Sequence, residues 1–304
     1  MADMRVNLCG VELKNPVIAA SGTFGYGMEY NEFYPVSRLG GISCKGTTLK
    51  ERLGNPGPRI AETPAGMLNS VGLQNPGVDA FLSTYLPWLR QQDTVVIANL
   101  AGHSVEEYCQ MAERLDASGV DMVELNISCP NVKEGGVNFG TSCDMVSAVT
   151  GEVKKRCRKP LMVKLTPNVS SIGDIAAAAE AAGADCISLI NTLTGMRIDI
   201  RTRRPILHNN TGGLSGPAVF PVAVRMVREV YKRVKVPVVG MGGISTWEDA
   251  AEMMIAGAAA VQVGAANFRD PFAMVKIIEG LEAFAGQQKL QSIAELTGTL
   301  AEWA

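Results

Sequence analysis

Paired cysteines, long hydrophobic runs and an excess of charge are all missing from this sequence. Its 304 residues include seven cysteines, an odd number, and no two of them form a CxxC pair. This scatter does not suit a disulfide framework, and it matches no zinc or iron–sulfur ligand spacing. We therefore expect free thiols in a reducing cytoplasm and no metal site, so that any iron–sulfur electron carrier belongs to another chain.

The charge pattern gives no reason to expect nucleic acid, because the formal net charge is only −2. The densest basic cluster comprises Arg197, Arg201, Arg203 and Arg204, and we interpret it as part of a solvated loop. No uninterrupted apolar run reaches membrane-spanning length, and residues 1–16 are typical of neither a signal peptide nor a basic anchor. We expect no membrane partner and interpret this first segment as a short hairpin.

What the sequence does contain is a regular alternation of strand-like and helix-like segments. Eight short apolar runs occupy 17–20, 41–45, 94–100, 122–127, 161–165, 186–190, 236–239 and 260–263. Helical patterns lie between most of them, at 78–90, 105–117, 144–156, 172–182, 221–234 and 247–255. Such alternation is typical of parallel strands joined by right-handed crossovers. It predicts an α/β fold, with residues 1–304 forming a single (β/α)8 TIM barrel domain with an N-terminal hairpin and long βα loops.

Signals at the helix ends support this repeat. Glycine follows three of the helical patterns, at Gly119, Gly183 and Gly257, where it is expected to be left-handed. Three helix starts have capping-box spacing, namely Ser104 with Glu107, Ser171 with Asp174, and Ser245 with Glu248. A doubly wound open sheet is the alternative fold, but no GxGxxG follows an early strand. The connections 46–77 and 191–220 are too long for bare barrel loops, so we expect lids, binding loops or contact surfaces there.

Polar side chains stand where the apolar runs end, which is where a barrel places its active site. The residues concerned are Lys45, Asn99, Asn126, Lys164 and Asn191. A lysine at the end of an apolar strand is rarely buried without a partner or a role. Its structural alternative is an ion pair at the barrel mouth, and single asparagines are often turn residues. Together these residues favour ligand recognition.

Glycines mark the ends of the last two strands, at Gly242-Gly243 and at Gly264-Ala265. Backbone N–H groups left free at helix starts after strands seven and eight are the usual phosphate site of this fold. The pattern therefore predicts a phosphorylated cofactor.

A thiol follows the fourth apolar run, where Cys129 and Pro130 lie between Asn126 and Asn131. Amides flanking a thiol suit a flat, uncharged ligand held beside a proton acceptor. The alternative is a buried structural cysteine. If the cofactor is a flavin, a nearby lysine would stabilise its reduced, anionic ring. The expected reaction is then dehydrogenation of a C–C bond next to a carbonyl, with the thiol as base.

At these residues the chain closely resembles the soluble dihydroorotate dehydrogenases, flavin enzymes of pyrimidine biosynthesis. The matching segments are 45–48 (KGTT), 54–59 (GNPGPR), 69–77 (NSVGLQNPG), 126–131 (NISCPN), 164–167 (KLTP), 191–192 (NT), 212–216 (GGLSG) and 242–243 (GG). The family's membrane-bound branch has serine in place of Cys129 and an amino-terminal anchor. Because this chain differs from that branch in both features, we expect it to belong to the soluble branch.

Two further segments, 43–48 (SCKGTT) and 193–199 (LTGMRID), resemble the NAD-linked heteromeric type. In that type an iron–sulfur, FAD-containing subunit passes electrons from this subunit to NAD⁺. The resemblance also implies a homodimer of this chain within a heterotetramer.

The resemblance assigns (S)-dihydroorotate as substrate, FMN as cofactor and Cys129 as general base. Implied FMN-binding residues are Ser21, Lys45, Gly46, Asn99, Asn126, Lys164, Ile190, Gly216, Gly242, Gly243, Gly264 and Ala265. Implied substrate-binding residues are Lys45, Asn69, Ser70, Val71, Gly72, Leu73, Asn126, Asn131, Asn191 and Thr192. The family usually has threonine at the position of Ala265, which removes one hydroxyl but keeps the backbone N–H.

Three other functions are compatible with these patterns. A homodimeric, fumarate-using dihydroorotate dehydrogenase would need no partner. A related flavin barrel could act on another dihydropyrimidine, such as dihydrouracil or a tRNA dihydrouridine, although the charge balance disfavours tRNA. A catalytically inert barrel that binds phosphorylated ligands predicts a colourless protein.

Overall fold

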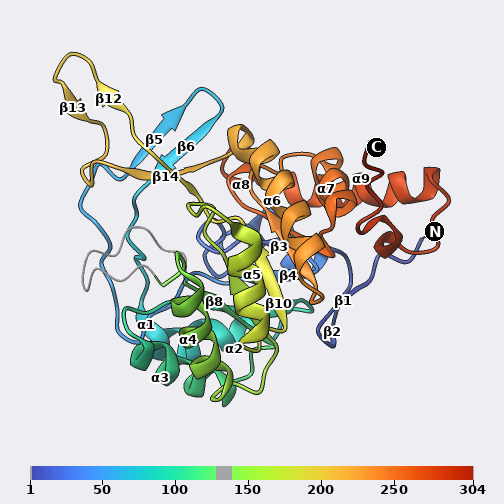
Figure 1. Cartoon of the computed structure of the whole chain (residues 1–304), viewed down its shortest axis with the longest axis horizontal. Coiled ribbons are helices and arrows are strands. Elements are labelled where there is room, and N and C mark those ends of the chain that lie inside the picture. Colours follow the sequence, from blue (N-terminus) through green and yellow to red (C-terminus); the bar gives the residue numbers. More distant parts are fainter. Residues whose placement is uncertain (1, 128–138, 304) are drawn as a thin grey trace.

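Eight parallel strands close into a barrel at the centre of the molecule (Figure 1). The structure is a computed structural model that describes residues 2–127 and 139–303. The barrel strands are β3 (Val17–Ala19), β4 (Gly41–Ser43), β7 (Val95–Leu100), β8 (Met122–Asn126), β9 (Leu161–Lys164), β10 (Cys186–Leu189), β15 (Val238–Met241) and β16 (Ala260–Val263). Neighbours pair in chain order and β16 closes the ring on β3. The predicted (β/α)8 barrel is confirmed.

Burial on both faces explains why the strands are almost wholly apolar in sequence. Residues of β4, β8, β9, β10, β15 and β16 are all buried, with the helical layer on one side and the barrel interior on the other. The predicted run 236–239 is shifted, because the strand begins at Val238. Pro237 has no N–H to donate to a neighbouring strand, although its carbonyl still accepts from Ile187.

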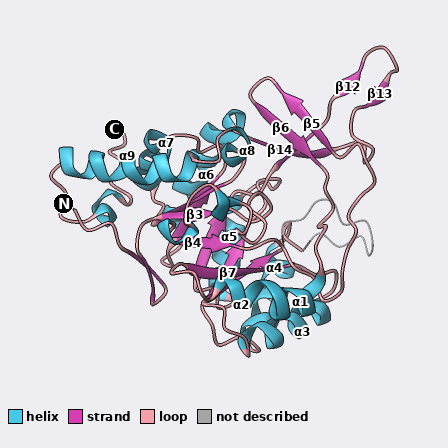
Figure 2. Ribbon diagram, turned by 180° about the vertical axis from the view of Figure 1, so that it is seen from behind, coloured by secondary structure: helices cyan, strands magenta, loops and turns pink. Residues whose placement is uncertain are grey.

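Helices surround the barrel (Figure 2). They are α3 (Val105–Asp116), α4 (Cys143–Lys154), α5 (Ile172–Ala181), α6 (Phe220–Arg233), α7 (Trp247–Ala256) and α9 (Ala273–Gln287). Between β4 and β7, α1 (Gly77–Ala80) and α2 (Leu86–Leu89) flank a π-helical turn, Phe81–Tyr85, and α8 (Ala266–Arg269) follows β16. Helices α8 and α9 were not predicted. Gly280 weakens the helical signal of α9, but a Cβ there would lie 2.2 Å from the Trp247 ring of α7, so tertiary packing requires the glycine.

The helix-end predictions are partly confirmed. The hydroxyls of Ser104 and Ser171 accept from the third N–H of their helices, as expected. The pairing of Ser245 with Glu248 is wrong, because Thr246 and Asp249 form the capping box one residue later. Both pairs have the same spacing, so sequence alone could not separate them. Gly183 and Gly257 have left-handed φ values of 102° and 137°, whereas Gly119 does not.

The two long connections fold into a small antiparallel sheet at one end of the barrel (Figures 1 and 2). Its strands are β5 (Ile60–Thr63) and β6 (Gly66–Asn69) from the first connection, and β11 (Leu193–Gly195) and β14 (Gly212–Ser215) from the second. Pairing of β14 with β6 joins the two. A projecting hairpin, β12 (Ile198–Asp199) and β13 (Arg204–Pro205), carries the basic cluster, whose solvent exposure is confirmed at residues 201–204.

The expected N-terminal hairpin is confirmed as β1 (Val6–Leu8) and β2 (Val11–Leu13). In the part of the chain that the structure describes, no helix is both long and apolar enough to span a bilayer.

The end of α7 provides a stability test. A Cβ at Gly257 would lie 2.3 Å from the Tyr231 ring, and the φ of 137° is unfavourable for any L side chain. We expect Gly257→Ala to lower the free energy of unfolding by roughly 2 kcal/mol or more. The matched control is Gly286→Ala in α9, where no atom would lie within 4 Å of the new Cβ and greater stability is expected. Urea unfolding measures the stability of both variants. Equal stabilities of Gly257→Ala and Gly286→Ala would contradict the requirement for glycine at position 257.

Candidate active site

A cavity of about 220 Å³ opens at the carboxyl ends of the barrel strands. Its walls include the residues at or just beyond seven strand ends, namely Ala20, Lys45, Asn126, Lys164, Ile190, Met241 and Gly264. Met67 and Asn69 of β6 and Ser215 of β14 also line it, so the small sheet forms part of its wall. The long connections therefore contribute to the wall of this cavity.

Most residues predicted for the site do line this cavity. Those predicted for the cofactor are Ser21, Lys45, Gly46, Asn126, Lys164, Ile190, Gly216, Gly242, Gly243, Gly264 and Ala265. Those predicted for the substrate alone are Asn69, Val71, Gly72, Leu73, Asn191 and Thr192.

Four predicted residues are not placed in the wall. Ser70 is fully buried outside it, and its N–H donates to the Arg59 carbonyl. Asn99 is buried behind Asn126. Cys129 and Asn131 lie outside the described residues.

Lys164 ends β9 and is buried, with only 5% of its surface exposed. It lines the cavity, so its ammonium provides a positive charge at a buried position in the wall. Lys45 follows β4 from the other side of the barrel and lines the same cavity. A buried positive charge suits a ligand that becomes anionic during reaction.

Below this cavity the barrel contains a completely buried carboxylate, Glu124 of β8. Its two oxygens accept four hydrogen bonds. Oε2 accepts from Ser43 Oγ and Asn99 Nδ2, both at 2.6 Å. Oε1 accepts from Ser188 Oγ at 2.8 Å and from Gln262 Nε2 at 2.7 Å. Burial alone would raise the pKa of Glu124, but the Lys164 ammonium and the donated hydrogen bonds outweigh it and hold the pKa below its ordinary value.

These contacts also fix the amides at the cavity. Because Asn99 donates its Nδ2 to Glu124, its Oδ1 is left to accept from Asn126 Nδ2, at 3.3 Å. Asn126 lines the cavity, so the buried carboxylate orients an amide of the cavity wall through one intermediate residue. Gly46 allows its backbone to pack against this pair, since a Cβ there would lie 2.9 Å from Asn99 Oδ1.

Glycines with left-handed conformations form one wall. Gly242 has φ 119° and Gly243 has φ 82°. A Cβ at Gly243 would lie 2.7–2.8 Å from Phe220, and one at Gly242 would lie 3.0 Å from Ile190. This wall therefore presents main chain rather than side chains, as an anion-binding turn requires.

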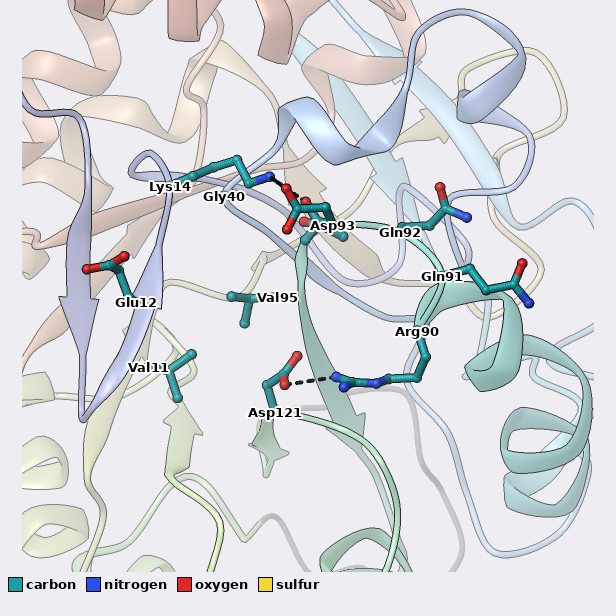
Figure 3. Close-up of a pocket in the computed structure, with 11 residues that line it drawn as sticks. Val11, Glu12, Lys14, Gly40, Arg90, Gln91, Gln92, Asp93, Val95 and Asp121 are labelled. Atoms are coloured by element: carbon teal, nitrogen blue, oxygen red, sulfur yellow. Dashed lines mark hydrogen bonds and ion pairs between the residues drawn. The ribbon is translucent and has the colours of Figure 1, made fainter.

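A second cavity, of about 730 Å³, is lined by residues that include Gly40, Thr94 and Asp121, which precede β4, β7 and β8, so it lies at the amino-terminal face of the barrel. Figure 3 shows its lining residues. Most of its charged groups form ion pairs with one another, Lys14 with Asp93 and Arg90 with Asp121, while Glu12 pairs with Arg5 outside the cavity. The amino-terminal face of such barrels serves stability rather than chemistry. We therefore place the candidate active site at the carboxyl end.

Glu124 and Gln262 were not predicted as site residues. Each lies two positions before a residue that was selected, Asn126 and Gly264 respectively, and successive residues of a strand alternate in direction. That period of two was the signal that could have identified them. Thr23, Ile60, Met67, Ser215, Met241 and Phe268 also line the cavity and were not predicted.

Comparisons with known proteins agree over nearly the full chain. The family model described as dihydroorotate dehydrogenase matches residues 3–285. The chain is 56% identical over 298 residues to the dihydroorotate dehydrogenase B (NAD(+)) catalytic subunit of Alkaliphilus oremlandii, covering 98% of this chain and 99% of that protein. It is 52% identical over 300 residues to the equally named protein of Petrotoga mobilis, covering 99% and 100%.

The lowered pKa of Glu124 predicts how the network responds to acid. A carboxylate whose pKa is lower in the folded state stabilises the fold above its unfolded value of 4.5, and this stability is lost as pH falls through the folded pKa. The difference in unfolding free energy between the wild type and Glu124→Gln should therefore be constant at neutral pH and shrink below pH 4.5. Denaturant titrations along a pH series measure it. A difference that grows in acid would contradict an ionised Glu124.

Proposed function

The chain belongs to the dihydroorotate dehydrogenase family of oxidoreductases, and we propose that it oxidises (S)-dihydroorotate to orotate in pyrimidine biosynthesis. The observation that carries this proposal is the cavity itself. Two lysines, a row of amides and a glycine wall converge there from separate strand ends. This combination suits a flat, hydrogen-bonding ring next to a phosphorylated cofactor.

The residues present fit FMN as the cofactor. Main chain exposed at Gly242 and Gly243 suits a phosphate. The amide oxygen of Gln262, at the cavity wall, is buried and lacks a hydrogen-bond partner among the described residues, so it has an acceptor to offer a ligand. Bound FMN would supply the hydride acceptor. Lys164 would stabilise the negative charge that reduction places on the ring.

Several cavity residues would hold the pyrimidine substrate. We assign this role to Lys45 and to the loop residues Asn69, Val71, Gly72 and Leu73, which line the cavity, and to Ser70 behind them. Asn126, Asn191 and Thr192 would complete the site from the strand ends, together with Asn131. Amides and backbone groups can read the carbonyls and N–H groups of a dihydropyrimidine without adding charge.

Cys129 would act as the general base, as the family resemblance implies. A thiolate can remove one proton from the carbon next to the substrate carbonyl while the neighbouring carbon loses hydride. Free cysteine has a pKa of about 8.5, so only a few per cent is thiolate at neutral pH. The rate of reduction should therefore rise with pH toward that value.

We further propose that electrons leave through a partner subunit that carries FAD and an iron–sulfur cluster and reduces NAD⁺. Two apolar side chains at the cavity wall, Ile60 and Phe268, are 53% and 56% exposed, which suits a docking surface close to the flavin. The assembly proposed is a homodimer of this chain within a heterotetramer, located in the cytoplasm. The six described cysteines are free, in keeping with a reducing compartment.

Flavin reduction tests the proposed chemistry directly. Purified protein should be yellow, and anaerobic dihydroorotate should bleach its flavin absorbance. Cys129→Ala should retain FMN but be reduced roughly 10²–10⁴-fold more slowly, the usual contribution of a general base. The control is Cys143→Ala, which removes an exposed thiol and should be reduced at the wild-type rate. Stopped-flow bleaching of Cys129→Ala at the wild-type rate would exclude the thiol as base, and a colourless protein would favour the inert barrel.

Steady-state assays test the electron acceptor. The isolated chain should reduce artificial dyes with dihydroorotate but form no NADH, because it has no dinucleotide fingerprint and no cysteine cluster. Adding the iron–sulfur, FAD-containing subunit should confer NADH formation, while the dye assay verifies that the catalytic half-reaction is intact. NADH formed without a partner would exclude the heteromeric assignment. Rapid turnover with fumarate would assign the chain to the homodimeric type.

A further inference from the structure

The interior of this barrel contains a polar layer where hydrophobic side chains are usual. Ser43, Glu124, Ser188 and Gln262 come from β4, β8, β10 and β16, which are alternate strands of the closed ring. Four side chains from alternate strands are the normal unit of barrel packing, but such layers are dominated by valine, isoleucine and leucine. Here all four are polar and fully or almost fully buried.

A single carboxylate organises this layer. The other three members each donate one hydrogen bond to Glu124, and Asn99 donates a fourth. Removing a carboxylate from water costs several kcal/mol, which its hydrogen bonds have to repay, and an apolar layer of similar volume would often be as stable. Stability therefore does not explain why the layer is polar.

Gln262 is the member of this layer that reaches the cavity. Its Nε2 donates to Glu124, which fixes the amide so that Oε1 is the atom left over. That oxygen is buried and has no hydrogen-bond partner among the described residues. A buried acceptor without a partner is costly, so its position at a ligand cavity points to a donor that the ligand supplies.

We propose that Gln262 is a flavin-binding residue, whose Oε1 accepts a hydrogen bond from bound FMN, and that Glu124 is the positioning residue that orients its amide. The inference rests on the proposed FMN cofactor and adds a contact that the family resemblance did not assign. Through Asn99, the same carboxylate orients Asn126, so one buried anion aligns amides on two sides of the cavity.

The charge and shape of Glu124 are both required for this role. A carboxylate offers two acceptor oxygens, one for Gln262 and one for Asn99. Glutamine at this position would offer one oxygen and one NH₂ group. Whichever way it turned, its NH₂ would face the NH₂ of Gln262 or of Asn99, and one of those amides would have to rotate.

The first experiment measures FMN binding by Gln262→Met, which keeps the side-chain length but removes the acceptor. Apo-protein is titrated with FMN, and thermal melts of the apo forms verify folding. We expect the dissociation constant to rise about tenfold, the effect of losing one buried hydrogen bond. The control is Ser188→Ala, which removes a donor to the same Glu124 oxygen but does not line the cavity, and its FMN affinity should stay within about twofold of wild type.

The second experiment adds Glu124→Gln and the double variant with Gln262→Met. The single variant should also bind FMN about tenfold more weakly, and its effect should be smaller in the Gln262→Met background, because Glu124 acts partly through Gln262. A purely structural layer would instead lower the melting temperature and leave FMN affinity unchanged, which would overturn the proposal. If Glu124→Gln does not fold, the comparison of Gln262→Met with Ser188→Ala still tests the proposal. Equal FMN affinities of these two variants would overturn it. Wild-type protein that binds no FMN would instead refute the proposed function.

Discussion

The hydrogen bonds that converge on the Glu124 carboxylate connect the interior of this barrel to its cavity. Donors from β4, β7, β10 and β16 meet on two oxygens of one β8 side chain. An unpaired carboxylate at this depth would be strongly destabilising, so these donors stabilise its charge. Strand register around the ring is thereby coupled to the orientation of the amides above it. The polar layer and the cavity wall therefore belong to one hydrogen-bonded network.

Closure of the barrel brings the polar residues of the strand ends together around one cavity. Lys45 and Lys164 lie far apart in sequence, but both belong to strand ends of the same parallel ring and line the same cavity. Parallel strands present all their carboxyl ends on one face, so each strand needs to contribute only one or two polar residues. The remaining strand positions can then stay apolar and hold the helices in place.

The long connections add a second level of organisation. Pairing of β6 with β14 unites segments that follow different barrel strands into one sheet beside the cavity. Close main-chain packing there depends on small residues, since a Cβ at Gly66 would lie 2.0 Å from the Ser215 carbonyl oxygen. This sheet places Met67, Asn69 and Ser215 in the wall, to which the short helix α8 also contributes Phe268. The cavity wall thus combines the ends of barrel strands with segments that lie outside the barrel.

The sequence by itself determined the strand and helix order, the barrel, and most of the residues at the strand ends. Those features depend on local periodicity and on chain-order pairing, both of which can be read along one segment at a time. Only the tertiary structure decided that Glu124 and Gln262 meet, that Asn99 supports Asn126 from behind, and that two distant connections form one sheet. Each of these is a pairing between residues 25 or more positions apart, and no local pattern records which distant partner a buried polar group will meet.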